Sequence, residues 1–320
     1  MKRTAVSVFL TAVMLLLLPL EAAAQTLLVP VGQVIGLQLD SSTVTVAAYD
    51  DALGSHARDA GIQIGDEITK IDGIPVHSAQ QVRQALTQQE LALTVRRGPR
   101  ETVLHITPRD TADGPRLGVF LRQGIAGIGT VTFYDPQTHA FGTLGHGVSG
   151  SRGSLLKMTQ GRLYPAQVQS VKRGLPGKPG QLRGLSQGDQ VTGTLLKNTP
   201  QGVFGTCPQG FPGQSIPTGS YQDIHLGEAS IRSTISGTEV QEYSVEILKI
   251  YPKTRADCRN FLLKVTDPAL LQATGGIVQG MSGSPIIQDG KLIGAVTHVL
   301  VNQPDTGYGI FIDNMLEAAG

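Results

Sequence analysis

A serine and a histidine, each set among glycines, are the residues of this chain best suited to chemistry. Ser282 lies in GMSGSP, residues 280–285, where glycine and proline favour a tight loop. Such a loop exposes the serine hydroxyl as a nucleophile and turns backbone N–H groups toward one point, where they can stabilise an oxyanion. The alternative is an ordinary turn whose serine bonds only its own backbone.

The histidine lies in FGTLGHG, residues 141–147, and is followed much later by the serine. A histidine between two glycines can approach another segment closely, because glycine backbones leave room. In the chain order His before Ser, His146 becomes a candidate general base for Ser282. A second histidine, His298, lies on a predicted strand and is interpreted as a pocket wall. The two loops together predict a serine peptidase.

Composition limits the other possibilities. The chain has 320 residues, which favours two globular units, and its formal charge of +1 supplies no basic field for nucleic acid. The 40 glycines, the absence of tryptophan and an aromatic content of 5% are typical of short strands and turns. We therefore expect a mainly β protein that binds no nucleic acid, and the proposed chemistry needs no metal or cofactor.

The N-terminus predicts export. Lys2 and Arg3 precede an apolar run over residues 5–20, and small residues follow it. We expect a signal peptide over 1–24, or a retained membrane anchor as the alternative, because the run is short for a membrane span. Outside the cytoplasm Cys207 and Cys258 could pair, but the sequence does not show their separation.

Residues 57–76 resemble a PDZ domain, with A-G-I at 60–62, G-D-E-I at 65–68 and I-D-G-I-P-V at 71–76. Ser78 is a predicted N-cap for a short helix. PDZ domains add an extended peptide to a sheet edge and hold its terminal carboxylate on backbone N–H groups. The resemblance implies that the peptide site comprises the loop Val34, Ile35, Gly36 and Leu37, with Arg83 on the neighbouring helix. A small β domain without ligand is the alternative.

The expected PDZ domain covers 28–110, and the polar segment 110–115 is the predicted linker to a domain over 115–320. In that second domain, short strands carry an early histidine and a late serine. This pattern fits a trypsin/chymotrypsin-like double β-barrel peptidase. The Gly- and Pro-rich segment 172–214 predicts long surface loops.

Two long segments, AGIGTVTFYDPQTHAFGTLGH at 126–146 and TGGIVQGMSGSPIIQDGKLIGAVTHVL at 274–300, resemble the SpoIVB (stage IV sporulation protein B) serine peptidase family. The resemblance implies Ser282 as nucleophile, His146 as base, Asp267 as the acid, and the N–H groups of Gly280 and Ser282 as the oxyanion hole. Asp267 followed by Pro268 is equally typical of a helix N-cap.

The resemblance also implies a role. Such peptidases are exported, work between forespore and mother cell, process themselves, and cleave a regulator of an intramembrane protease to activate a late sigma factor. We expect protein substrates, peptide binding by the PDZ domain, and membrane association through the N-terminus. The alternatives are a PDZ-containing quality-control protease of the envelope, which the domain order disfavours, and an inactive PDZ scaffold.

Overall fold

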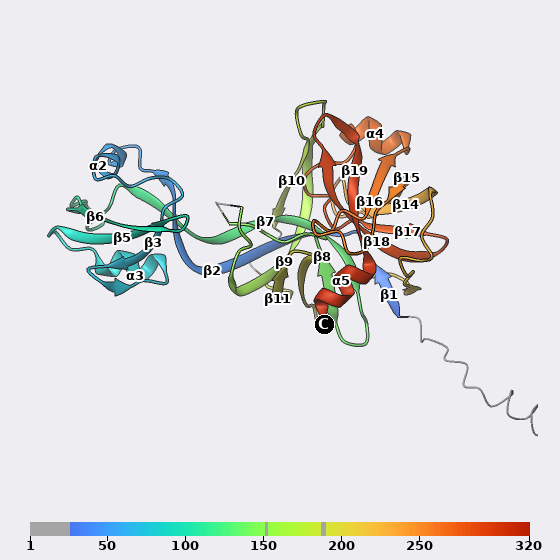
Figure 1. Cartoon of the computed structure of the whole chain (residues 1–320), viewed down its shortest axis with the longest axis horizontal. Helices are drawn as coiled ribbons and strands as arrows, with labels where there is room; N and C mark the ends of the chain where they lie inside the picture. The colour runs from blue at the N-terminus through green and yellow to red at the C-terminus, as the bar shows by residue number, and fades with distance from the viewer. Residues whose placement is uncertain (1–25, 151–152, 187–189) are drawn as a thin grey trace, which may run out of the picture.

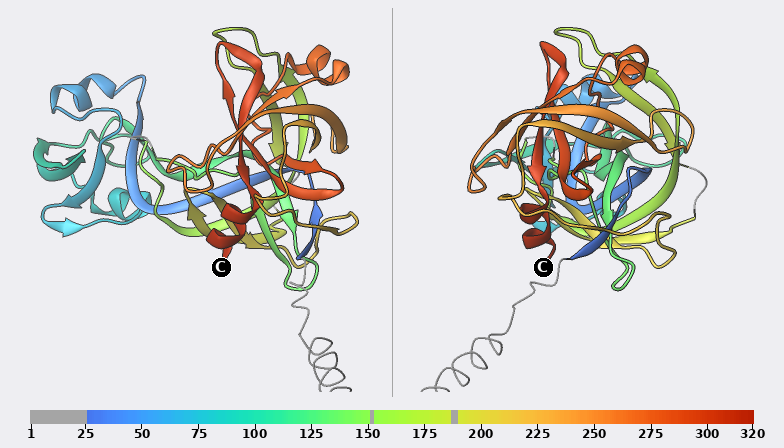
Figure 2. Two further views of the ribbon diagram at one scale, coloured as in Figure 1. Left: turned by 45° about the vertical axis from the view of Figure 1, so that its right-hand side comes forward. Right: turned by 90° about the vertical axis from the view of Figure 1, so that its right-hand side faces the viewer.

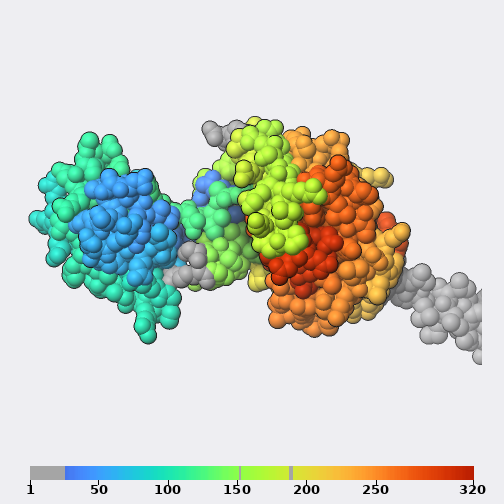
Figure 3. Space-filling view, turned by 90° about the horizontal axis from the view of Figure 1, so that it is seen from above, coloured from blue at the N-terminus to red at the C-terminus, as the bar shows by residue number. Residues whose placement is uncertain are grey.

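The computed structural model describes residues 26–150, 153–186 and 190–320, and these are mainly β. Two lobes of unequal size are joined by a narrow neck, as the space-filling view shows (Figure 3). The expected signal peptide or anchor over 1–24 lies outside the described residues. Within the described ranges, no helix is both long enough and apolar enough to cross a membrane.

The larger lobe begins with a six-stranded barrel. Its strands are β2 (Val34–Tyr49), β7 (Val119–Tyr134), β8 (Ala140–Thr143), β12 (Gly202–Thr206), β11 (Gly193–Thr199) and β9 (Met158–Lys172). Pairing in that order closes the barrel, because β9 returns to pair with β2. Its interior is apolar and includes Ile35, Leu37, Leu163 and Val203. At its edges, β1 (Leu27–Pro30) pairs with β7 and with β13 (Ile216–Pro217), and β10 (Gln181–Ser186) pairs with β9.

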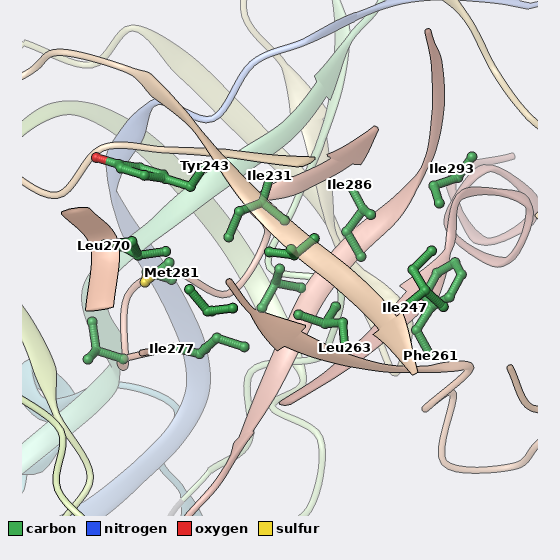
Figure 4. Packing of buried hydrophobic residues seen from close by; sticks show 14 of the residues in the cluster. Ile231, Tyr243, Ile247, Phe261, Leu263, Leu270, Ile277, Met281, Ile286 and Ile293 are labelled. Atoms are coloured by element: carbon green, nitrogen blue, oxygen red, sulfur yellow. The ribbon is translucent and has the colours of Figure 1, made fainter. Parts of the chain in front are cut away.

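A second barrel completes this lobe. It closes in the order β14 (Gly227–Ser233), β15 (Gln241–Ile250), β16 (Phe261–Val265), β19 (Gln303–Phe311), β18 (Lys291–Leu300) and β17 (Pro285–Gln288). Alternate residues of β16 point inward, as a half-buried strand requires. They pack with residues from the other strands around Ile231 and Ile286 (Figure 4). Helices α4 (Pro268–Thr274) and α5 (Ile312–Ala319) lie outside the strands. The expected double barrel is confirmed.

The smaller lobe contains the segment that resembles a PDZ domain, and it precedes most of the barrel strands in the chain. It contains β3 (Glu67–Ile71), β4 (Ile74–Pro75), β5 (Leu91–Arg97), β6 (Arg100–Ile106), α2 (Gly54–Asp59) and α3 (Ala79–Ala85). Helix α3 begins as predicted, since the Ser78 hydroxyl accepts the Gln81 N–H at 3.0 Å. Asp66 of the G-D-E-I segment is buried and accepts from Arg97 Nε at 2.6 Å. Local sequence therefore predicted these elements well.

Strands β2 and β7 belong to both lobes. They pair from Val34 opposite Thr130, in the first barrel, to Tyr49 opposite Val119, in the PDZ sheet. Figure 1 and the left view of Figure 2 show β2 running from one lobe into the other. The PDZ domain is therefore inserted between two neighbouring strands of the first barrel, and two strands connect it to the peptidase.

Because of this insertion, the observed boundaries between the lobes differ from the domain boundaries expected from the sequence. Leu28 and the strand from Val34 to Leu39 lie in the barrel lobe, so the change to the PDZ lobe comes later than residue 28. Residues 110–115, the expected linker, form a turn closed by pairing of Arg109 with Arg116. Leu117 then packs in the PDZ core. The local sequence indicated a turn correctly, but the chain returns to the barrel only along β7.

The predicted PDZ carboxylate loop also needs correction. Val34, Ile35, Gly36 and Leu37 are buried in β2, between β7 on one side and β9 on the other. A strand with a partner on both edges has no free N–H row for a peptide. These four residues form barrel wall, and the peptide edge must be sought elsewhere in the PDZ lobe.

Two further expectations concern the second half of the chain. Cys207 and Cys258 are both free and buried, in different apolar clusters. The segment 172–214, expected as loops, contains β10, β11 and β12. Barrel neighbours supply the backbone partners for these short strands despite the many glycines and prolines.

Candidate active site and peptide edge

The serine loop follows α4 and enters β17. Gly283 carries φ +98°, and a Cβ there would meet the carbonyl oxygen of Thr130 at 2.0 Å. Only glycine fits this contact between the serine loop and β7. The loop is also tied down by Thr130, whose N–H donates to the Ser282 carbonyl at 3.1 Å and whose hydroxyl donates to the Gly280 carbonyl at 2.8 Å. The first barrel therefore positions the serine loop of the second.

The oxyanion donors expected from the sequence are available. Among the described residues, the N–H groups of Gly280 and Ser282 donate to no backbone carbonyl, whereas those of Met281 and Gly283 donate to Val278 and Val296. Backbone N–H groups without partners are uncommon beside a protein interior. Two such groups, two residues apart on one loop, are suited to a developing negative charge.

His146 is carried by the loop that follows β8. Its neighbour Gly145 has φ +65°, and a Cβ there would lie 2.8 Å from the Thr297 methyl carbon. This close approach brings the histidine loop against β18 of the second barrel. His146 Nδ1 lies 3.0 Å from the Gly147 carbonyl oxygen. Because a carbonyl only accepts, this bond places the proton on Nδ1 and leaves a lone pair on Nε2.

Burial is the larger influence on the His146 pKa, and it lowers that pKa below the ordinary value for histidine. The bond to Gly147 opposes this effect but is smaller. A neutral imidazole at physiological pH is the form that a general base needs.

The structure brings Ser282 and His146 to the same cavity. Both side chains line a space of about 640 Å³ between the two barrels. The Ser282 hydroxyl donates to the Thr297 carbonyl at 2.7 Å. Rotation about its Cα–Cβ bond must therefore precede proton transfer to His146. The residues lining the cavity are mostly apolar and include Leu37, Leu144, Ile277 and Val299.

His298 lines this cavity as well, as the sequence interpretation of a pocket wall proposed. Its ring centroid lies 5.1 Å from that of His146. Burial, together with smaller effects of the nearby His146 and Arg259, lowers its pKa to about 4. Its Nδ1 is buried and has no hydrogen-bond partner among the described residues. A neutral ring with a free polar atom therefore faces the base.

Asp267 lies away from the cavity. It is the N-cap of α4, with Oδ1 accepting the Leu270 N–H at 2.9 Å, while Oδ2 lies 3.5 Å from the Ser244 N–H. It does not line the cavity that holds Ser282 and His146. Its position therefore agrees with the helix cap predicted from the local sequence, and not with the acid role that the resemblance implied. No Asp or Glu is found among the described residues that line this cavity, and the Gly147 carbonyl orients His146 instead.

The PDZ lobe offers a different peptide edge from the one expected. From Val119 to Ile128 the strand partner of β7 is β2 alone, so the other edge of β7 has no strand beside it in the described structure. Helix α3 lies next to this edge, since Gln123 bonds to Ala79 and His77 at its start. Arg83 is exposed on the same helix.

The residues just before this edge are suited to a carboxylate. Leu117 and Gly118 are both buried, yet within the described chain neither N–H donates to a backbone carbonyl. Gly118 has φ +80°. A positive φ directly before a free strand edge turns successive N–H groups toward one side, as anion-binding backbone nests do. In the sequence, GPRLGV over 114–119 is the pattern that indicates this loop, in place of residues 34–37.

Within the described ranges, no three His, Cys, Asp or Glu side chains converge to hold a metal ion.

Comparisons with known proteins gave matches to two family models and to several solved structures. Residues 113–316 match the family described as SpoIVB peptidase S55, and residues 52–97 match a PDZ domain. No match is found among curated proteins. The active form of the Rv3671c protease from M. tuberculosis is 14% identical, with a TM-score of 0.39 over 61% of this chain and 75% of that chain. The HtrA-type protease AlgW with a decapeptide is also 14% identical, with a TM-score of 0.37 over 66% of this chain and 57% of that chain.

Proposed function

Because the chain belongs to the SpoIVB peptidase S55 family and carries a PDZ domain, we propose that it is an exported serine endopeptidase in which Ser282 is the nucleophile and His146 the base. The observation that carries this assignment is the shared cavity: the two side chains, from different barrels, face the same space of about 640 Å³. The free N–H groups of Gly280 and Ser282 complete the arrangement.

The mechanism follows from the positions of the protons. With Nδ1 donating to Gly147, His146 Nε2 takes the proton of Ser282 as its oxygen attacks a peptide carbonyl. The oxyanion is stabilised by the N–H groups of Gly280 and Ser282. His146 then protonates the leaving amine as the C–N bond breaks, and an ester on Ser282 remains. A water molecule, deprotonated by His146, hydrolyses this ester and restores the serine.

The biological role that we propose is the one the family suggests. The enzyme processes itself and cleaves a regulator of an intramembrane protease, and this cleavage leads to activation of a late sigma factor during sporulation. It acts in the space between forespore and mother cell, either secreted or held at the membrane by its N-terminal segment. Membership of the SpoIVB family supports this role.

A fluorophosphonate probe tests the nucleophile. Labelling of the wild-type protein and its loss in Ser282→Ala are expected. Ser284→Ala is the matched control, because Ser284 lies two residues away but is fully buried, with its hydroxyl donating to Ser233 at 3.1 Å. Labelling that survives in Ser282→Ala but disappears in Ser284→Ala would show that Ser284, and not Ser282, is the nucleophile.

Self-processing is tested separately by mass spectrometry of the purified full chain. N-terminal fragments should appear with time in the wild type and be absent from Ser282→Ala. Fragments that form at the same rate in both proteins would contradict self-processing and leave the peptidase assignment intact.

A further inference from the structure

Strand β7 connects the two candidate sites directly. It begins at Val119, beside the free N–H groups of Leu117 and Gly118, and it reaches the serine loop at Thr130. There the Thr130 N–H donates to the Ser282 carbonyl. The edge of β7 that is free of strands in the PDZ lobe therefore leads to the backbone of the proposed nucleophile.

Two adjoining cavities accompany this strand. The catalytic cavity is lined by Ile125, Gly127 and Ile128 of β7. A second cavity, of about 420 Å³, lies between the lobes and is lined by Arg122, Gly124 and Ile125. Ile125 lines both cavities, so the two spaces lie on either side of one residue of β7.

The chain after His146 forms a wall common to both cavities. Gly147, Val148 and Ser149 line the catalytic cavity, whereas residues 154–157 line the cavity between the lobes. Different residues of the segment that follows the proposed base therefore line the two cavities.

The direction of a bound peptide is fixed by the position of the free N–H groups. A peptide added to the edge of β7 with its terminal carboxylate at Leu117 and Gly118 runs antiparallel to β7. Its upstream residues then extend toward Gln123 and the neck. The substrate residues that precede the tail therefore reach the catalytic cavity. The tail itself lies on the leaving-group side of the cleaved bond.

The strand also sets a length. Gly118 and Thr130 are 12 positions apart (130 minus 118), which corresponds to about 40 Å of extended chain. An antiparallel peptide matches β7 approximately residue for residue, so about 10–12 residues separate the carboxylate from the cleaved bond.

The charges of the second cavity favour acidic residues in this interval. Arg96, Arg122 and Lys157 line it, against one carboxylate, that of Glu67. Arg96 lies 3.9 Å from Glu67, whereas Arg122 and Lys157 form no ion pair within the part of the chain that the structure describes. Arg122 lies on β7 itself and Lys157 lines the same cavity, so two exposed cations lie close to the strand that a bound tail would join.

We propose that the substrate is a protein with a free, acidic C-terminal tail, which binds the PDZ edge and the catalytic cavity together and is cut about 10–12 residues before its end. The inference rests on the proposed function, since it assumes that Ser282 cleaves peptides. It adds the class of substrate and the position of the cut.

The test uses the full chain and two pools of random-sequence peptides long enough to span both sites, one with free C-termini and one with C-terminal amides. Mass spectrometry then locates each cut. We expect cuts in the free-acid pool to gather about 10–12 residues from the end and cuts in the amide pool to be dispersed and fewer. The same distribution in both pools would overturn the proposal, while cuts that persist in Ser282→Ala would instead contradict the proposed function.

Binding supplies a readout apart from turnover. Immobilised Ser282→Ala protein should retain the free-acid pool, enriched in Asp and Glu before the end, and not the amide pool. Equal retention of both pools contradicts the proposal.

A charge reversal tests the path between the sites. Lys157→Glu should reduce cleavage of acidic free-acid peptides by about two- to fivefold, as expected for an exposed charge contact. Lys249→Glu is the matched control, because Lys249 is exposed on β15 and lines neither cavity. Equal effects of the two reversals would contradict a substrate tail in this cavity. So would a dimer of the wild type, seen in sedimentation, that Lys157→Glu dissociates, because a second copy of the chain would then occupy the cavity.

Discussion

The hydroxyl of Ser282 donates to the carbonyl oxygen of Thr297 at 2.7 Å, and this bond occupies its only proton. The nucleophile is therefore not bonded to His146 in the structure, although both line the same cavity, and its side chain must rotate before the proton can be transferred. Rotamer changes of this kind are fast compared with enzyme turnover. The bond to Thr297 therefore need not limit the rate of the reaction.

The pH dependence of the reaction should report His146. Its pKa is lowered chiefly by burial, so the basic form persists below the ordinary histidine pKa of about 6.5. The acid limb of kcat/KM, or of fluorophosphonate labelling, should have its midpoint below that value, with activity rising as pH increases. His146→Gln should lose activity by about 10⁴-fold or more. A midpoint above the ordinary value would contradict a buried base.

Asp267 should matter for stability and not for catalysis. Asp267→Asn keeps an oxygen that accepts the Leu270 N–H, so it should change the free energy of unfolding little, whereas Asp267→Ala should cost about 1 kcal/mol. Denaturant unfolding and kcat measured on the same proteins separate the two roles. If Asp267 were the orienting acid, Asp267→Asn would instead lower kcat by about 10⁴-fold.

His298 should make the fold sensitive to acid. Its folded pKa is about 4, below that of an unfolded histidine, so the unfolded state binds the extra proton between these values. The stability from the neutral ring is therefore fully present above pH of about 6.5 and is lost as pH decreases toward 4. His298→Phe should flatten this part of the pH–stability curve, measured by urea unfolding. An unchanged curve would show that His298 is not the group responsible.

The buried carboxylate of Asp66 should depend on Arg97. Arg97→Met leaves that carboxylate without its cation and should destabilise the PDZ lobe by about 2–3 kcal/mol. Arg96→Met is the control, since Arg96 lies 3.9 Å from Glu67 and is about half exposed, and it should cost less than about 1 kcal/mol. Hydrogen exchange of amides in the PDZ lobe measures the loss of stability in both variants. Equal losses would contradict the prediction that the buried carboxylate of Asp66 depends on its cation.

Local patterns predicted the parts of the site that are local. The glycines around Ser282 and His146 indicated exposed loops, and the chain order indicated that these loops meet. The same kind of pattern identified Asp267 as a cap, while the family resemblance pointed to a different role. The structure follows the local pattern, because the Asp267 carboxylate accepts the Leu270 N–H three residues later.

The long-range arrangement could not be predicted in this way. The alternation at Val34 to Leu39 correctly indicates a strand, but alternation does not specify which sheet the strand joins. Here that strand pairs with β7 and β9, which are far away in sequence. Similarly, Leu182, Leu195 and Val203 lie in short strands within a Gly- and Pro-rich segment, because the barrel supplies partners that the segment itself does not reveal.

The double connection through β2 and β7 has a consequence for the mechanics of the enzyme. A domain on a single linker can swivel, and one cut releases it, whereas this one resists both, because each of its ends continues a strand of the same barrel. Excising it by truncation would open the barrel wall as well. Its genuine removal requires a short hairpin turn that rejoins residues near Leu39 and Ile125.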